Sequence, residues 1–330
     1  MGNTVLISDL FERVLIDPAE HADRLYIVSG YATPAMAFHH LNKLRDLGKR
    51  VNVELIMGMC SAEGIGQSHH SGFKSLVEND FNGLLKCSYL KELPPVHTKM
   101  YAWYSGDTPV AGFTGSANYT QSAFGRRQRE MMEECSPEEC LEYFRAICGQ
   151  TIYCNHIDVE NQINVYNDRD LLRRRRQMRL TEDTIQGPAT PIEGLDCVTI
   201  SLLDSRGALP ARSGLNWGQR PEYNREPNQA YIRVPIDIAR RRFFPPRSED
   251  FTVLTDDGKT IVCTIAQDND KAIESPQNNS MIGEYFRNRL GLASGAPVDT
   301  SDLVRYGRID VVFCKIDPET YYMDFSPPST

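Results

Sequence analysis

The feature that most constrains this fold is a pair of basic side chains, His97 and Lys99, followed later by the turn Gly115-Ser116-Ala117-Asn118. Residues two apart on a strand share a face, so a strand over 96–104 would present both basic groups together. A hairpin turn at 106–107 and a return strand over 110–114 would bring the small-residue turn back beside them. The sequence therefore predicts a hairpin that gathers these polar groups.

The gathered groups are suited to phosphodiester cleavage without a metal. His97 can attack phosphorus and form a phosphohistidine, while Lys99 and Asn118 donate to the non-bridging oxygens. Ser116 adds another donor. Glu130 can accept a hydrogen bond from an imidazole N–H, which fixes the tautomer and raises the basicity of the ring. These five residues are the predicted catalytic set, and none is assigned to a metal or a cofactor.

One histidine cannot be nucleophile and leaving-group acid in the same step. The first half of the chain contains a single copy of the motif, so a symmetric dimer would have to supply the second imidazole. Taken separately, each motif is typical of a solvated strand face, a turn or a surface ion pair. Their order and spacing together carry the prediction.

The rest of the first half alternates strands and helices. A strand at 24–31, a helix at 35–47 and a strand at 51–59 predict a parallel crossover. Further expected elements are an amphipathic helix within 1–20, an edge-like strand at 84–90 and a helix from Ser136 to about 147. The pattern favours an α/β catalytic domain over residues 1–178.

Composition excludes several other classes of protein. The chain has a net charge of −8, no apolar run long enough to span a bilayer and no secretory leader pattern. We therefore expect a cytoplasmic protein without a membrane partner. The nine cysteines include no CxxC pair, which favours reduced thiols over a zinc module.

The composition changes near residue 170. A basic run at 173–179 is either a solvated helix face or a phosphate-contacting segment, and residues 179–194 are the predicted linker. From 195 to 330 the pattern is mostly β, with strands expected at 197–203, 229–234, 251–255, 260–266 and 309–316 and helices at 236–244 and 282–290.

Two long polar segments interrupt this β domain, and we interpret them as arms that read double-stranded DNA. The alternative is that they are ordinary polar loops. Residues 201–247 contain nine Arg and four acidic residues, and Arg, Asn and Gln are the side chains that bind guanine and adenine bidentately. The candidates are Arg212, Asn216, Trp217, Gln219, Arg220, Asn224 and Arg225 in the first arm and Lys271, Gln277, Asn278 and Asn279 in the second.

The first half resembles the phospholipase D superfamily through His97-x-Lys99, Gly115-Ser116-x-Asn118 and Glu130. Members with one motif per chain are nucleases that build the active site across a dimer. The resemblance implies His97 as nucleophile, its dimer mate as acid, Lys99 and Asn118 on the phosphate, and Glu130 supporting the imidazole. One departure is Tyr104, which stands where many members have Asp.

The second half is similar in layout to the plant transcription-factor-type DNA-binding pseudobarrel, which is open and mainly β. Together with Gly283–Leu292, this arrangement resembles Type II restriction endonucleases of the BfiI and NgoFVII type. The resemblance implies a homodimeric, site-specific endonuclease. It leaves open whether an ATPase or methyltransferase of the same system is a further partner. The alternatives are a DNA-binding regulator with a vestigial nuclease fold and a phospholipid-cleaving enzyme.

Overall fold

The computed structural model describes residues 4–125, 128–167, 195–276 and 278–327. The chain divides into two compact units, Met1–Asp168 and Arg169–Thr330, and each is described by itself. The predicted linker and the basic run at 173–179 lie outside the described residues. No described helix is both long and apolar enough to cross a membrane.

An eight-stranded mixed sheet organises the first unit, in the order β1-β8-β7-β6-β2-β3-β5-β9. Strands β2, β3 and β5 are parallel neighbours, which confirms the predicted crossover. The other neighbouring pairs are antiparallel. The strands are β1 Val5–Leu6, β2 Arg24–Ser29, β3 Asn52–Met57, β5 Leu85–Leu90, β6 Met100–Ser105, β7 Thr108–Gly115, β8 Met132–Cys135 and β9 Thr151–Tyr153.

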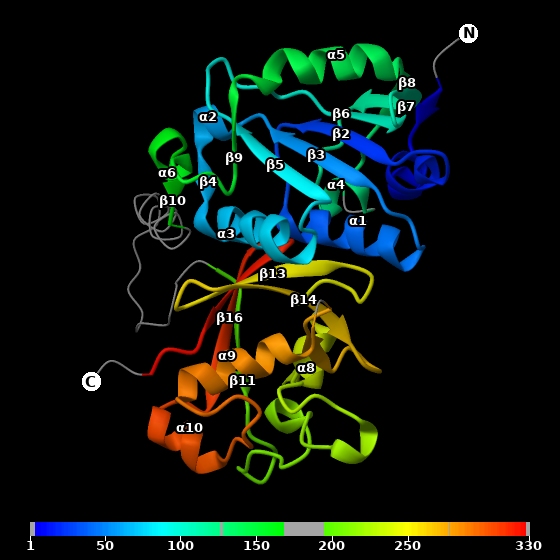
Figure 1. The fold of residues 1–330 in the computed structure, drawn as a ribbon. Helices are drawn as coiled ribbons and strands as arrows, with labels where there is room; N and C mark the ends of the chain where they lie inside the picture. Colours follow the sequence, from blue (N-terminus) through cyan, green and yellow to red (C-terminus); the bar gives the residue numbers. More distant parts are fainter. Residues whose placement is uncertain (1–3, 126–127, 168–194, 277, 328–330) are drawn as a thin grey trace, which may run out of the picture. The chain divides into compact units, whose positions relative to one another are not determined.

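Helices cover both faces of this sheet. Figure 1 shows α1 (Pro34–Asp46) and α3 (Gln67–Ser75) on one side and α5 (Pro137–Cys148) on the other. Ser136 caps α5 by accepting from the Glu139 amide, as its sequence predicts. Shorter elements are η1 Phe11–Ile16, η2 Asp17–Glu20, α2 Cys60–Glu63, η3 Leu76–Asp80, α4 Gln121–Phe124, α6 Val159–Gln162 and the parallel pair β4 Ile65–Gly66 and β10 Val165–Tyr166.

Three predictions for this unit are wrong. Strand β5 lies between β3 and β9, so it is not an edge strand. The amphipathic helix expected within 1–20 is two short irregular turns, η1 and η2, preceded by β1. His97 and Lys99 precede β6 instead of lying on it. The Val96 amide donates to the Gly58 carbonyl instead of to β7, so this segment crosses the end of β3 and pairing with β7 starts only at Met100.

A seven-stranded sheet forms the second unit, in the order β11-β16-β17-β13-β14-β15-β12. It is a nearly closed barrel, as the pseudobarrel prediction requires. Its ladders are antiparallel except between β13 and β17. The strands are β11 Cys197–Ser201, β12 Ile232–Arg233, β13 Asp250–Thr255, β14 Thr260–Ala266, β15 Ala272–Glu274, β16 Asp310–Asp317 and β17 Thr320–Asp324.

Helices close the core of this barrel. They are α8 Ile236–Arg240, α9 Ser280–Leu290 and α10 Thr300–Tyr306, with the short turns η4 Gly214–Asn216 and η5 Pro221–Tyr223. Phe244, Phe251 and Tyr321 pack their rings together inside. Strands β15 and β17 and helix α10 were not predicted from the sequence. The three residues of β15 are too few to show an alternating pattern.

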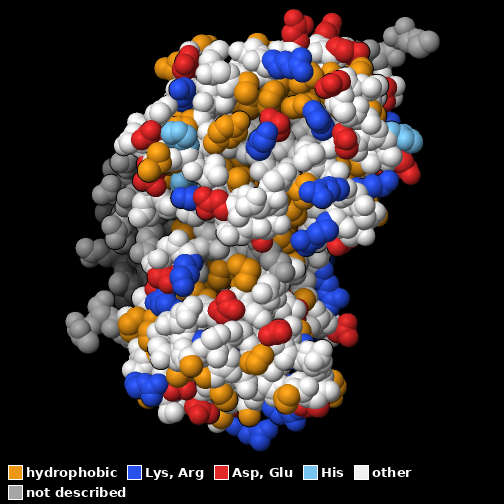
Figure 2. Space-filling model, in the orientation of Figure 1, with side chains coloured by type: hydrophobic (Ala, Val, Ile, Leu, Met, Phe, Trp, Pro, Cys, Tyr) orange, Lys and Arg blue, Asp and Glu red, His pale blue; other side chains and the backbone are white. Residues whose placement is uncertain are grey.

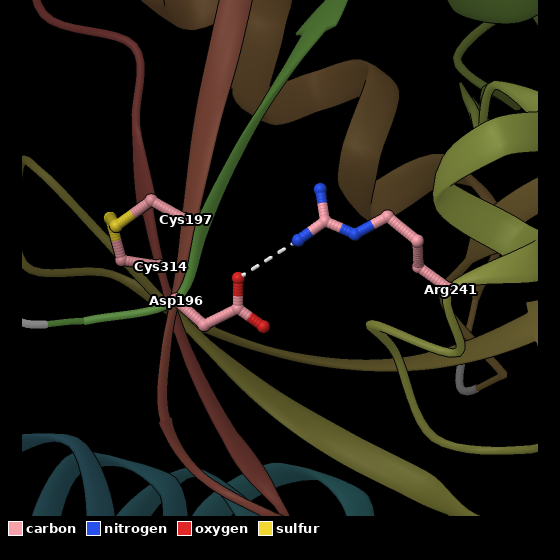
Figure 3. Close-up of a disulfide and its surroundings, with 4 residues drawn as sticks. All are labelled: Asp196, Cys197, Arg241 and Cys314. Carbon is pink, nitrogen blue, oxygen red and sulfur yellow. Dashed lines mark hydrogen bonds and ion pairs between the residues drawn. A yellow bond between two sulfur atoms is a disulfide. The ribbon is translucent and has the colours of Figure 1, made fainter.

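One pair of cysteines contradicts the expectation of reduced thiols. Cys197 on β11 and Cys314 on β16 face each other in the ladder and form a disulfide, while the other seven cysteines are free. The cross-link closes a separation of 117 residues, which in the chain-entropy account stabilises the fold by about 5 kcal/mol. Beside it, Asp196 pairs with Arg241 at 3.3 Å (Figure 3).

Candidate active site and DNA-reading arms

The ends of four strands meet at one edge of the first unit's sheet. Val28 pairs with Met100, and Met100 pairs with Thr114, so the end of β2, the start of β6 and the end of β7 lie together. The segment carrying His97 crosses the end of β3, where the Val96 amide donates to the Gly58 carbonyl at 3.0 Å. A Cβ on Gly58 would lie 1.9 Å from the Val96 carbonyl oxygen, so this crossing requires glycine.

His97 and Lys99 lie in contact, as the sequence predicts. Lys99 Nζ is 2.9 Å from His97 Nδ1, 3.3 Å from Nε2 and 2.7 Å from the His97 carbonyl oxygen. The lysine is buried whereas the imidazole is exposed. Burial lowers the pKa of Lys99, and the Glu130 carboxylate acts in the opposite direction. A desolvated ammonium beside an exposed imidazole is an arrangement that an anion would stabilise.

Asn118 joins this pair from the turn after β7. Its Oδ1 accepts from the Tyr31 amide at 3.1 Å and lies 3.4 Å from Ser29 Oγ. Because the carbonyl side of the carboxamide is used, its NH₂ group is left to donate to an anion. The segment after β2 that orients Asn118 was not anticipated from sequence, although Gly30 was a signal. A Cβ there would lie 3.1 Å from His97 Cδ2.

Ser116 and Glu130 form a second contact in the site. Gly115 pairs with Met132 across β7 and β8, and this register returns Glu130 to the Gly-Ser turn. Ser116 Oγ donates to Glu130 Oε2 and accepts from the Met131 amide at 3.1 Å. Among the described contacts, the carboxylate therefore binds Ser116, whereas the sequence analysis assigned it to the imidazole. Its influence on Lys99 is electrostatic.

The first arm of the second unit runs from β11 to β12, and two of its predicted base readers are structural instead. Asn216 is 2% exposed. Its amide donates to the Pro210 and Val298 carbonyls and accepts from the Val298 amide, so the prediction that it reads a base is wrong. Gln219 donates to the Pro227 and Gly295 carbonyls. Both side chains fold the arm.

Other first-arm candidates are more accessible. The Arg225 guanidinium lies 3.7 Å from the centre of the Trp217 ring, a cation–π contact that holds both side chains in place. Arg212 pairs with Glu222. Asn224 is exposed in a left-handed conformation at the end of η5, and Arg220 is half-buried.

The second predicted arm, residues 267–280, is interrupted by β15 (Ala272–Glu274). Lys271 is exposed at its end. Asn278 is exposed and its Oδ1 accepts from the Ser280 amide at the start of α9, while Asn279 is half-buried. Gln277 lies outside the described residues. On the face seen in Figure 2, basic and acidic side chains are interspersed over much of the surface.

Helix α9 holds the first arm through Arg287, which is 0% exposed. Its guanidinium donates to the carbonyls of Ala296, Gly283, Leu215 and Pro227. A Cβ on Gly283 would lie 1.8 Å from the Asn228 carbonyl oxygen, so glycine is needed where the arm meets the helix. The Gly283–Leu292 segment thus supports the arm from inside.

Comparison with known proteins finds two family matches. Residues 8–161 match the NgoFVII restriction endonuclease N-terminal PLD domain. Residues 191–317 match the NgoFVII C-terminal B3-like DNA-binding domain. No curated protein matches.

Solved structures similar to part of this chain include three proteins at 16% identity. NucT from Helicobacter pylori has a TM-score of 0.34 over 46% of this chain and 98% of its own. Nuc from Salmonella typhimurium, a phospholipase D family member, has a TM-score of 0.34 over 46% and 97%. The phosphatidylserine synthase of Haemophilus influenzae has a TM-score of 0.36 over 55% and 46%.

Proposed function

Since residues 8–161 belong to the NgoFVII restriction endonuclease PLD domain family and residues 191–317 to its B3-like DNA-binding domain family, we propose that this chain is a Type II site-specific endonuclease that cuts DNA without a metal. The observation that carries the proposal is the exposed His97 imidazole held 2.9 Å from the buried Lys99 ammonium. The second unit supplies the site specificity.

The chemistry proceeds in two displacements at phosphorus. In the first, a His97 ring nitrogen forms a bond to phosphorus, the bond to the leaving nucleotide oxygen breaks, and the partner subunit's His97 protonates that oxygen. In the second, water attacks phosphorus in the phosphohistidine and the N–P bond breaks. The water loses a proton to the imidazole of the partner subunit's His97, which gave up its own proton in the first step. In both steps the Lys99 ammonium offsets the charge of the phosphoryl oxygens, and the Asn118 NH₂ group donates hydrogen bonds to them.

Ser116 and Glu130 serve the site together. The Ser116 hydroxyl donates to the Glu130 carboxylate and accepts from the Met131 amide. These hydrogen bonds hold the turn that carries Asn118 against the start of β8. The carboxylate favours the charged form of Lys99, because it raises the pKa that burial lowers. In the dimer, Glu130 orients an imidazole, which is the role that the family resemblance assigns to it.

Exposed apolar side chains around this edge support a second copy of the chain. Met131, beside Ser116, is 54% exposed, and Leu93, just before the His97 segment, is 69% exposed. Ile7, which follows the residue paired with Met132, is 76% exposed. Exposed apolar groups on a surface are typical of interaction sites, and Met131 and Ile7 both adjoin the start of β8, next to the Gly-Ser turn.

Two other functions are less well supported. A DNA-binding regulator with a vestigial nuclease fold would not need the intact His97, Lys99 and Asn118 set. A phospholipid-cleaving enzyme would not need a B3-like DNA-binding domain.

Mixed dimers test the shared site. Wild-type chains are co-refolded with increasing fractions of His97→Ala chains, and cleavage of DNA is measured at constant total protein. If each site needs two imidazoles, an equal mixture keeps about a quarter of the activity, whereas independent monomers keep about half. A linear decline with the mutant fraction contradicts the dimer. A matched series with the variant His21→Ala, an exposed histidine far along the chain from the motif, controls for refolding losses.

A further inference from the structure

Tyr31, which no sequence pattern singled out, contacts two groups of the active site. It follows β2, and its backbone amide donates to Asn118 Oδ1 at 3.1 Å. Its ring meets the His97 imidazole edge to face, with centroids 5.9 Å apart and an interplanar angle of 82°. Aromatic rings prefer this geometry, so the tyrosine ring restricts the orientations open to the imidazole.

Glu63 anchors that tyrosine from a different part of the fold. It is the last residue of α2, and its Oε1 accepts from the Tyr31 hydroxyl at 2.8 Å. Burial and this hydrogen bond raise the pKa of Tyr31 to about 12. The phenol therefore stays neutral and remains a donor to the carboxylate over the whole physiological range.

The end of α2 is itself fixed. Gly64 has a φ of +75°, and a Cβ there would lie 2.2 Å from the Asn164 carbonyl oxygen. The next residue, Ile65, donates from its amide to that same carbonyl at 2.9 Å and pairs with Val165. Glu63 therefore projects from a short segment that is paired and closely packed, which suits it to hold another side chain in place.

This pair has little to contribute to stability, because Tyr31 is 38% exposed and hydrogen bonds at the surface contribute little net free energy. Its effect falls on the imidazole instead. Attack on phosphorus requires a ring nitrogen in line with the leaving oxygen, and small misplacements of reacting groups are costly to rate. Gly30 also lies close to the ring, because a Cβ there would be 3.1 Å from His97 Cδ2.

We propose that Tyr31 and Glu63 are positioning residues, which hold the His97 imidazole in the orientation for in-line attack. This inference rests on the proposed function for its kinetic consequence. We therefore expect the two residues to act as one unit, because removing either the Tyr31 hydroxyl or the Glu63 carboxylate releases the Tyr31 ring that packs against the imidazole.

The test is a double-mutant cycle with Tyr31→Phe, Glu63→Leu and both together. The rate of phosphohistidine formation is measured in a single turnover, and DNA affinity is measured by gel shift. Each single variant should slow the step by about tenfold, and the double variant should be no slower than either. DNA affinity should not change. Glu63→Gln keeps an acceptor and should recover most of the rate. Tyr153→Phe, a half-exposed tyrosine on β9, is the matched control.

Wild-type rates in Tyr31→Phe, or effects of the two single changes that multiply in the double variant, would overturn the inference. A wild-type chain that forms no phosphohistidine would instead refute the proposed function. In that case, NMR relaxation of the ¹³C-labelled His97 ring still tests whether Tyr31 positions the imidazole. We expect the ring to be ordered in the wild type and more mobile in Tyr31→Phe, and equal mobility in the two proteins contradicts the positioning role.

Discussion

His97→Ala is expected to abolish DNA cleavage while specific DNA binding remains. In the proposed mechanism the change removes the attacking nitrogen and the acid of the partner site as well, so the rate should fall by at least about 10⁴-fold. The second unit is untouched, because His97 belongs to the first unit. The cleavage rate is measured on a plasmid, and specific binding is measured by gel shift on DNA that contains the cleavage site.

His21→Ala is the control for this change, since it removes an exposed histidine near η2 and should cut at the wild-type rate. Cleavage by His97→Ala at a rate close to the wild type would remove His97 from the mechanism. Loss of DNA binding along with cleavage would show that the substitution had disturbed more than the reaction.

Arg287→Met should unfold the first arm of the second unit. The methionine fills part of the space but leaves unpaired the carbonyls that Arg287 binds in the arm, at Leu215 and Pro227. Leaving a buried carbonyl without its donor costs about 1–3 kcal/mol. Urea unfolding followed by probes in the second unit should show the loss, and sequence-specific binding should weaken although Arg287 cannot touch DNA.

Arg305→Met is the matched control, because Arg305 has a 64% exposed side chain and pairs with Asp302 on the surface of α10. Exposed ion pairs contribute roughly 0–1 kcal/mol, so this variant should unfold almost as the wild type does. Equal stability of the two variants would contradict the supporting role of Arg287.

The sequence indicated which candidate residues lie near one another better than it indicated their local structure. The hairpin of β6 and β7 brings Asn118 back towards His97 and Lys99 as its turn and strand pattern indicate. The pattern could not show that the basic pair precedes the strand, because that depends on where the chain crosses Gly58. The hydrogen bond between Ser116 and Glu130 likewise depends on the register of β7 and β8, which no local sequence pattern specifies.

The arms show the limit of an inventory of side-chain types. Asn216 and Arg287 both belong to residue classes that read bases, yet both are buried and bind backbone carbonyls. Asn216 meets Val298, 82 residues away, and such long-range packing decides which polar side chains face solvent. The half-buried Arg225 and Trp217 pair stays a proposed DNA contact, and so do Arg212, Arg220, Asn224, Lys271, Asn278 and Asn279.

The most direct test of metal-free, site-specific cutting is digestion of a mixed-sequence plasmid in excess EDTA, followed by sequencing of the ends. EDTA removes the divalent cations that other nucleases use to activate water and to bind the phosphate, whereas the chemistry proposed for His97, Lys99 and Asn118 uses none. We predict discrete fragments whose ends share one short sequence context. Strict dependence on added Mg²⁺, or cutting at random positions, would contradict this account.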